Sequence, residues 1–340
     1  MKPARSSSLE RVQSLHKLGG SALLAVFWAV IVLTMAVASW FFWLQQRLQL
    51  HGEETRGVEA LAMAHSGISL ALHSKVDRYS SLLQAEVAPG VGYRVTIEGE
   101  GGRLNLKTIL TVLLNRNDPQ NREMRSFFER WLQFVVGVNP LEMDRLVSCL
   151  IDYVDEDNIA LLNGQEDNKD YHPANRMIQS LDELRRIPGM EPLLAYPGWE
   201  ELLTLEGDNL LDLLEAPEEL LRQLPGFGEA QVQRWLQMRS GPDQIWHTED
   251  DYKAKDVQQT LTAIGIAQAF TGASPQPSAG RRTPAGGDGQ NATPFLPRYL
   301  IVGGQTIRIR SEGYSGKVVR QVQVVVRKTG DSSQIKSWIE

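Results

Sequence analysis

The chain has 340 residues, of which 42% are hydrophobic and 22% are charged, and its formal net charge is -6. This length suits one membrane segment and two soluble units of domain size. Residues 1–20 are basic, so the remainder of the chain is more acidic than the total charge indicates. An acidic main part argues against nucleic acid as the principal partner. Cys149 is the only cysteine, which excludes an intramolecular disulfide.

An apolar stretch at residues 21–44, SALLAVFWAVIVLTMAVASWFFWL, contains no charged residue. As a helix it would measure about 36 Å and could cross a bilayer core of about 30 Å. The basic segment before it predicts a cytoplasmic N-terminus and an exported C-terminal part. A secretory signal peptide has a shorter apolar core, followed by a small-residue cleavage site. Here the small residues Gly19 and Gly20 precede the apolar stretch instead.

This order of basic leader, glycines and apolar stretch resembles the type IV prepilins and the type II secretion pseudopilins. The resemblance implies that a prepilin peptidase cuts between Gly20 and Ser21, removes the leader of residues 1–20, and N-methylates Ser21. Most members carry Glu at the fifth mature position, which is Ala25 here. In the family that carboxylate pairs with the N-terminal amine of a neighbouring subunit. Its absence fits a subunit at the filament tip and is typical of the general secretion pathway protein K family. An uncleaved single-pass anchor is the alternative.

Beyond the span, apolar residues at spacings of three and four extend the helical pattern, which Pro89-Gly90 ends. Residues 93–97 alternate as a half-buried strand. No clear strand follows for nearly two hundred residues. Residues 299–310 and 317–327 then read as strands on either side of a turn-rich connector at 311–316.

These patterns, with the resemblance, predict an α+β fold. A pilin-like long N-terminal helix packs on a small antiparallel sheet, with a large all-α domain inserted between sheet strands. We expect residues 21–44 to form the transmembrane or filament-core helix, and residues 45–106 to hold the rest of the helix and the first strands. The inserted domain then covers 107–270, a Gly- and Pro-rich flexible linker 271–297, and the final strands 298–340.

The clearest helical pieces of the insertion are residues 124–136, 140–154, 180–187 and 217–224. Ser180 and Glu183 form a capping box. The segments 184–189 and 221–226 both resemble the turn of helix-hairpin-helix modules, which bind DNA. The second turn, however, places Glu229 where a phosphate would need a cation. A structural brace is therefore the favoured interpretation, and a membrane-tethered helix-hairpin-helix protein that binds or takes up DNA is the alternative.

Carboxylates and amides are dense from residue 152 to residue 170, and Ca²⁺ prefers six to eight such oxygen ligands. The loop is not an EF-hand, because Ile159 and Ala160 stand where an oxygen ligand and glycine are needed. The pattern L-I-D-Y-V-D-x-D, then G-x-E-D and Tyr171, resembles a hallmark of the protein K family, whose inserted domain holds calcium. The resemblance implies a structural calcium ion with these candidate ligands: Asp155, Asp157, Glu166, Asp167 and Asp170. A solvated acidic loop is the alternative.

We expect no enzyme, because no grouping of His, Ser or Cys nucleophiles accompanies the carboxylates. The resemblance implies a minor pseudopilin that caps the tip of the periplasmic pseudopilus and helps to initiate its assembly for protein export. Implied partners are the minor pseudopilins I and J, with H as a further candidate, the prepilin peptidase, and the inner-membrane assembly platform. The implied location is the inner membrane, crossed once with the bulk in the periplasm, and afterwards the pseudopilus tip.

Overall fold

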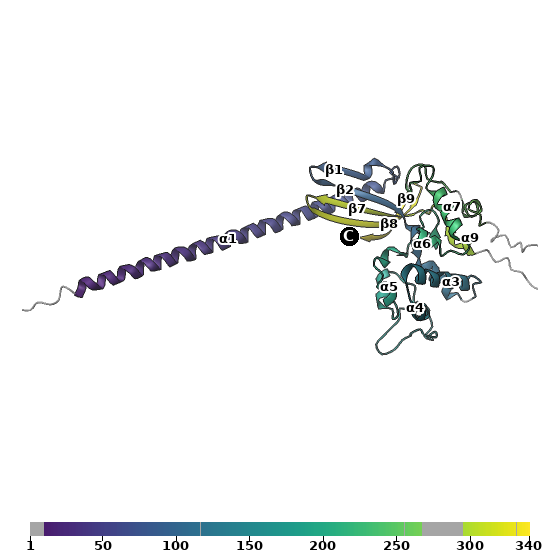
Figure 1. Ribbon diagram of the computed structural model, residues 1–340, viewed down its shortest axis with the longest axis horizontal. Helices are drawn as coiled ribbons and strands as arrows, with labels where there is room; N and C mark the ends of the chain where they lie inside the picture. The colour runs from purple at the N-terminus through teal and green to yellow at the C-terminus, as the bar shows by residue number, and fades with distance from the viewer. Residues whose placement is uncertain (1–9, 116, 255, 267–294, 331) are drawn as a thin grey trace, which may run out of the picture.

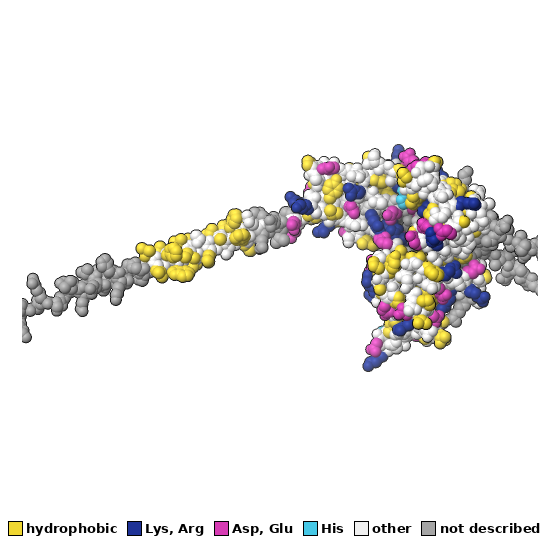
Figure 2. Space-filling view, in the orientation of Figure 1, with side chains coloured by type: hydrophobic (Ala, Val, Ile, Leu, Met, Phe, Trp, Pro, Cys, Tyr) yellow, Lys and Arg dark blue, Asp and Glu magenta, His cyan; other side chains and the backbone are white. Residues whose placement is uncertain are grey.

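The computed structural model describes residues 10–115, 117–254, 256–266, 295–330 and 332–340. One continuous helix, α1 (Glu10–Ala71), extends far from the folded part of the chain (Figure 1). Its segment Leu23–Gln45 is apolar, unburied and long enough to span a membrane. Figure 2 shows this segment as an almost unbroken hydrophobic surface. The predicted membrane-length helix is therefore present.

A five-stranded antiparallel sheet packs against the C-terminal half of α1. Its order is β1-β2-β7-β8-β9, with β1 (Gln84–Ala88), β2 (Val91–Gly99), β7 (Thr306–Ser315), β8 (Val318–Thr329) and β9 (Ser332–Ile339). The neighbours β2 and β7 are far apart in sequence, and Gly99 lies opposite Ile307. The inserted domain therefore leaves and re-enters the sheet at adjacent residues, which confirms the predicted pilin-like α+β architecture.

The edges of the sheet differ from the sequence-based expectation. Helix α1 ends at Ala71, and in the turns that follow Asp77 and Ser80 accept hydrogen bonds from nearby backbone amides. Pro89-Gly90 then forms the β1–β2 turn rather than ending a helix. The expected connector at 311–316 is mostly strand, since β7 continues to Ser315. The chain turns at Gly316, which has a φ of 59°, and Lys317 before β8 begins.

The core of the pilin-like domain lies between α1 and the sheet. Ala64, Ile68 and Ala71 of α1 are buried against valines and isoleucines of the central strands, namely Val95, Ile97, Ile309, Val322, Val324 and Val326. The contact between helix and sheet is closest at Gly313 of β7. A Cβ atom there would lie 1.9 Å from the carbonyl oxygen of Ala60. Only glycine allows the helix backbone to rest directly on this strand.

The insertion is mainly helical. Its helices are α2 (Leu106–Leu114), α3 (Asn121–Trp131), α4 (Pro140–Asp152), α5 (Glu191–Leu194), α6 (Glu218–Leu221), α7 (Glu229–Arg239), α8 (Val257–Ala263) and α9 (Phe295–Tyr299). A π-helical turn at Leu132–Val136 extends α3, and the predicted capping box of Ser180 and Glu183 begins a 3-10 helix at Leu181–Arg186. Most of the predicted linker lies outside the described residues, and α9 begins before its end.

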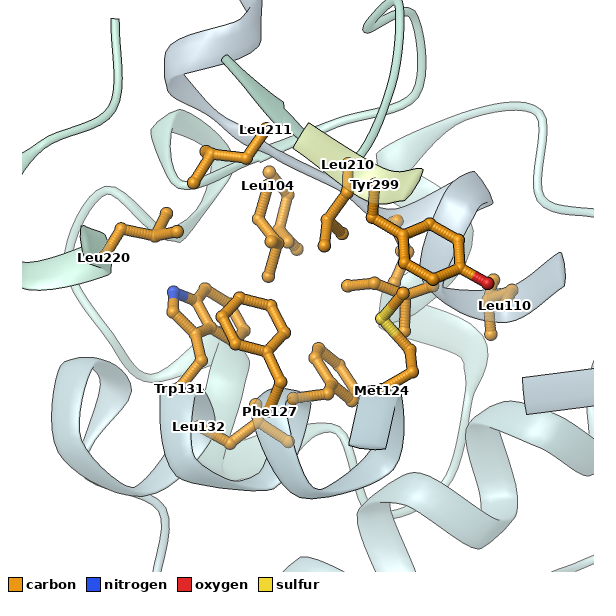
Figure 3. Close-up of a cluster of buried hydrophobic side chains, with 14 of the residues drawn as sticks. Leu104, Leu110, Met124, Phe127, Trp131, Leu132, Leu210, Leu211, Leu220 and Tyr299 are labelled. Atoms are coloured by element: carbon orange, nitrogen blue, oxygen red, sulfur yellow. The ribbon is translucent and has the colours of Figure 1, made fainter. Parts of the chain in front are cut away.

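Two short parallel strand pairs also occur in the insertion, and the sequence did not predict these pairings. β3 (Leu104–Asn105) pairs with β4 (Leu203–Thr204), and β5 (Leu211–Asp212) pairs with β6 (Leu300–Ile301). They adjoin a large apolar core in which Phe127 and Trp131 of α3 point toward Leu104 and Leu210 (Figure 3). Two-residue strands are too short to produce a period-two pattern. The expected strand at 299–310 is divided between the end of α9, the short strand β6 and β7, which begins only at Thr306.

A charged network fixes the insertion to the sheet. The fully buried carboxylate of Glu100 accepts two hydrogen bonds from Arg308 of β7, at 2.8 and 2.7 Å. Glu201 of the insertion bonds to Arg103 at 2.8 Å and also to Arg310. Burial alone would raise the pKa of Glu201, but its hydrogen bonds from Arg310 and Arg103 lower this pKa to about 2. The Glu201 carboxylate therefore stays ionised at neutral pH.

A second charged contact joins the two domains on another side. Arg78, which follows α1, lies 2.7 Å from Glu215 of the insertion. His247 lies 3.3 Å from the same carboxylate. Against the effect of burial, His247 and Arg78 lower the pKa of Glu215 to about 2.

Candidate functional site

The acidic loop is folded back onto the C-terminal end of α4. Asp152, the last residue of that helix, is fully buried, and both of its carboxylate oxygens lie 3.2 Å from the backbone nitrogen of Leu161. Asn163 donates a hydrogen bond of 2.8 Å to Asp144, also on α4. The Gly164 nitrogen donates to the carbonyl of Leu161. The helix end thus provides the base on which the loop is built.

Three carboxylates meet where the loop returns to α4. One oxygen from each of Asp152, Asp155 and Glu166 can be chosen so that all lie within 4.8 Å of one another. The backbone passes so close to them that a Cβ on Gly164 would lie 1.9 Å from Oδ2 of Asp152. Like charges at such distances repel strongly unless a proton or a cation is present.

The electrostatics of Glu166 fit a cation site. Burial, followed by the charges of Asp155 and Asp152, raises the pKa of Glu166 to about 7. Both buried carboxylate oxygens of Glu166 lack a hydrogen-bond partner among the described residues, as do the Tyr171 hydroxyl and Oδ1 of Asn175. Donors that are all oxygen suit a hard ion such as Ca²⁺. The residues present therefore fit a calcium ion chemically.

The structure brings together only part of the ligand set predicted from the sequence. Asp155 and Glu166 belong to the group of three carboxylates. Asp157 accepts a hydrogen bond from the nitrogen of Ile159, Asp167 contacts His172, and Asp170 is exposed. These three lie outside that group.

Asp152 is the member of the group that the sequence analysis did not select. Asp152 belongs to the L-I-D-Y-V-D-x-D pattern. Because it follows an apolar helical segment directly, it was counted with that helix and not among the candidate ligands. A signal was present nonetheless, because an Asp at the buried end of a helix requires a compensating partner.

The other predicted positions lie elsewhere. Gly20 and Ser21 fall within α1, but their side chains lie outside the described residues. Ala25 is exposed on the apolar part of α1. In the second hairpin-like turn, Arg222 forms ion pairs with both Glu218 and Glu229. These contacts neutralise the basic side chain of this turn and agree with the interpretation of a structural brace.

Comparison with known proteins supports one family. Residues 102–196 match the family model "Type II secretion system (T2SS), protein K". A type II secretion system protein K of Dickeya chrysanthemi is 30% identical over 132 residues, which are 36% of this chain and 36% of that protein. The match therefore spans about a third of the relative's length.

The fold is also similar to a solved structure, the crystal structure of the GspK-GspI-GspJ complex from the type 2 secretion system of enterotoxigenic Escherichia coli. The TM-score is 0.53 at 15% identity, and the match covers 87% of this chain and 98% of the other. At this identity the likeness is one of fold. Together with the sequence matches, it makes the chain similar to protein K of type II secretion systems in part of its sequence and in its fold.

Proposed function

We propose that this chain is a protein K-type minor pseudopilin of a type II secretion system, which caps the tip of the periplasmic pseudopilus and helps to initiate its assembly for protein export. The single observation that carries the proposal is the bulky insertion beside the sheet, at the end of the molecule remote from the free end of α1 (Figure 1). Ala25, in place of the usual carboxylate, supports a position with no subunit above it. The work of the protein is then assembly and recognition rather than catalysis or nucleic-acid binding.

The proposed partners are the minor pseudopilins I and J, and the complex named for the structurally similar protein supports them. Protein H, the prepilin peptidase and the inner-membrane assembly platform complete the set. The chain would start in the inner membrane, with its N-terminus in the cytoplasm and its bulk in the periplasm, because basic residues precede the membrane-length segment. It would then leave the bilayer as its helix joins the filament core.

Processing at Gly20 tests the proposal. Mass spectrometry of the membrane form should show a chain that begins at N-methylated Ser21. A bulky side chain should not fit the peptidase site, so Gly20→Leu should leave the leader attached and abolish secretion. Ala25→Ser, a small change within the same helix, serves as the control and should be processed normally. Secretion at the wild-type level by the Gly20→Leu chain would contradict the proposal.

We also propose that Asp152, Asp155 and Glu166 hold a structural calcium ion. The ion would neutralise the clustered carboxylates and tie the loop to the end of α4. The buried oxygens of Glu166 and Asn175 that lack a hydrogen-bond partner support this assignment. Its role would be to fix the loop, with no part in a reaction.

Removal of the ion should lower stability measurably. With Ca²⁺ at about a hundred times its Kd, binding adds about 2.7 kcal/mol to the free energy of unfolding, and a chelator removes this. Glu166→Gln should abolish the heat of Ca²⁺ binding in calorimetry and the effect of the chelator. The matched variant Asp170→Asn should retain both, because Asp170 lies outside the group of three carboxylates. If calorimetry of the unmodified chain shows no heat of binding at millimolar Ca²⁺, the proposed calcium site is refuted.

A further inference from the structure

Strand β9 is an open edge of the main sheet. It pairs with β8 on one side, and no strand within the described residues pairs with its other side. Seven of its eight residues are exposed, Ser337 being the exception, and Lys336 is its only charged residue. Natural edge strands are normally short, charged or covered, since their free backbone groups pair readily with another strand. β9 has little of this protection apart from one irregularity in its pairing with β8.

Apolar side chains lie on both faces of this edge. Trp338 lies opposite Val324, on the face covered by α1, and its ring stacks on His65 with centroids 5.5 Å apart. Ile339 lies opposite Gln323 and so projects from the other face. Trp338 is 41% exposed and Ile339 is 58% exposed. An added strand would therefore find apolar neighbours on both of its faces.

A groove of about 480 Å³ runs beside this edge, between the sheet and the inserted domain. Val325, Ser337 and Ile339 line it from the sheet, and Leu181 and Leu205 line it from the insertion. On the side of β7, the ion pair of Glu100 with Arg308 closes the gap between the domains. The groove consequently opens toward β9.

The rim of the groove is acidic. Asp182 and Glu200 both line it, with side chains that are 82% and 54% exposed, and both pair with the single cation of Arg185. Since these two carboxylates share the positive charge of one guanidinium, this part of the rim keeps a net negative charge. A matching partner therefore carries Lys or Arg beside its apolar residues. A second copy of this chain would bring two such acidic rims together, which disfavours self-association through β9.

We propose that β9 and this groove dock an extended segment of a neighbouring minor pseudopilin, which adds a sixth strand to the sheet. Backbone hydrogen bonds to β9 would supply affinity, and alternate apolar side chains entering the groove would supply specificity. A basic residue of the segment would meet Asp182 and Glu200. The identity of this partner rests on the proposed function.

The opposite edge of the sheet lacks these features. β1 has five residues, its pairing with β2 is irregular, and the carboxylate of Glu86 is folded back onto the nitrogen of Gly90 at 2.7 Å. None of the residues that line the groove comes from β1. β1 therefore serves as an internal control.

Amide hydrogen exchange on the full-length chain in detergent, with and without the minor pseudopilins I and J, tests the proposal. Outward-facing amides of β9 should exchange about tenfold more slowly in the complex, while those of β1 should not change. Ile339→Asp should weaken the complex about tenfold or more. Val87→Asp on β1, where Val87 is 66% exposed, should leave affinity unchanged. Unaltered thermal unfolding of both variants confirms that they are folded.

The possible failures are distinguishable. A complex that forms without protecting β9, or that tolerates Ile339→Asp, overturns the docking inference and leaves the proposed partners standing. If neither I nor J binds, the proposed partners are wrong. The docking inference is then tested by amide hydrogen exchange of the chain with a synthetic peptide of about ten residues in which Ile and Lys alternate. Protection of β9 by this peptide supports a strand-docking edge, and its absence refutes one.

Discussion

Replacing Glu100 with alanine should lower the free energy of unfolding by about 3–5 kcal/mol. The variant removes a fully buried carboxylate and leaves the guanidinium of Arg308, itself only 7% exposed, without its two short hydrogen bonds and with a longer contact of 3.6 Å to Glu201. An unpaired buried charge costs far more than the loss of an exposed ion pair. Denaturant unfolding of the full-length chain, followed by the fluorescence of its tryptophans, measures the change.

Two further variants separate this effect from a general loss of packing. Glu218→Ala removes an exposed partner of Arg222 and should cost no more than about 1 kcal/mol. The double variant Glu100→Leu with Arg308→Met removes both charges, so it should be more stable than Glu100→Ala alone. A single variant as stable as the unmodified chain would show that the network does not hold the insertion to the sheet.

Gly313→Ala should be the second most damaging change, at about 3 kcal/mol or more. Its new methyl group would lie 1.9 Å from the carbonyl oxygen of Ala60 and 2.3 Å from the nitrogen of Ala64, and these backbone atoms cannot rotate away. The helix would have to lift from β7. Thermal unfolding together with exchange of the α1 amides should show both the loss of stability and its location.

Gly57→Ala is the matched control on α1. Its added methyl group would meet only the flexible side chain of Arg320, at 3.5 Å. Because alanine is the better helix former, this variant should be neutral or more stable by up to about 1 kcal/mol. If both variants lost the same stability, the close contact between α1 and β7 would not be the reason for glycine at position 313.

The sequence predicted those parts of the fold that carry a repeating signal. The apolar run of α1, the alternation in β2 and the β-branched residues of β7 and β8, together with the family resemblance, predicted the pilin-like architecture. The edge strands β1 and β9 were missed, because residues exposed on both faces need not alternate between apolar and polar. Helix α1 also ended at Ala71, earlier than its apolar stripe indicated, and local turns at Asp77 and Ser80 follow it.

The candidate metal site was predictable as a region but not as a set of ligands. Carboxylate density pointed to residues 152–170, and the family pattern added calcium. Which oxygens meet depends on how the loop turns back at Leu161 and Gly164 onto the end of α4. That return brings in Asp152 and leaves Asp157, Asp167 and Asp170 outside the group.

The side-by-side ends of the insertion have a mechanical consequence. The chain leaves the sheet after Gly99 and resumes its pairing at Ile307, directly opposite. Tension applied along α1 reaches β7 through the close contact at Gly313 and spreads across the strands.

The covalent path of the load does not run through the inserted domain, because its two ends lie opposite each other in the sheet. The ion pairs of Glu201 with Arg310 and of Glu215 with Arg78 hold the domain in place beside that path. The covalent connections therefore leave the inserted domain and its acidic loop outside the direct path of a load along α1.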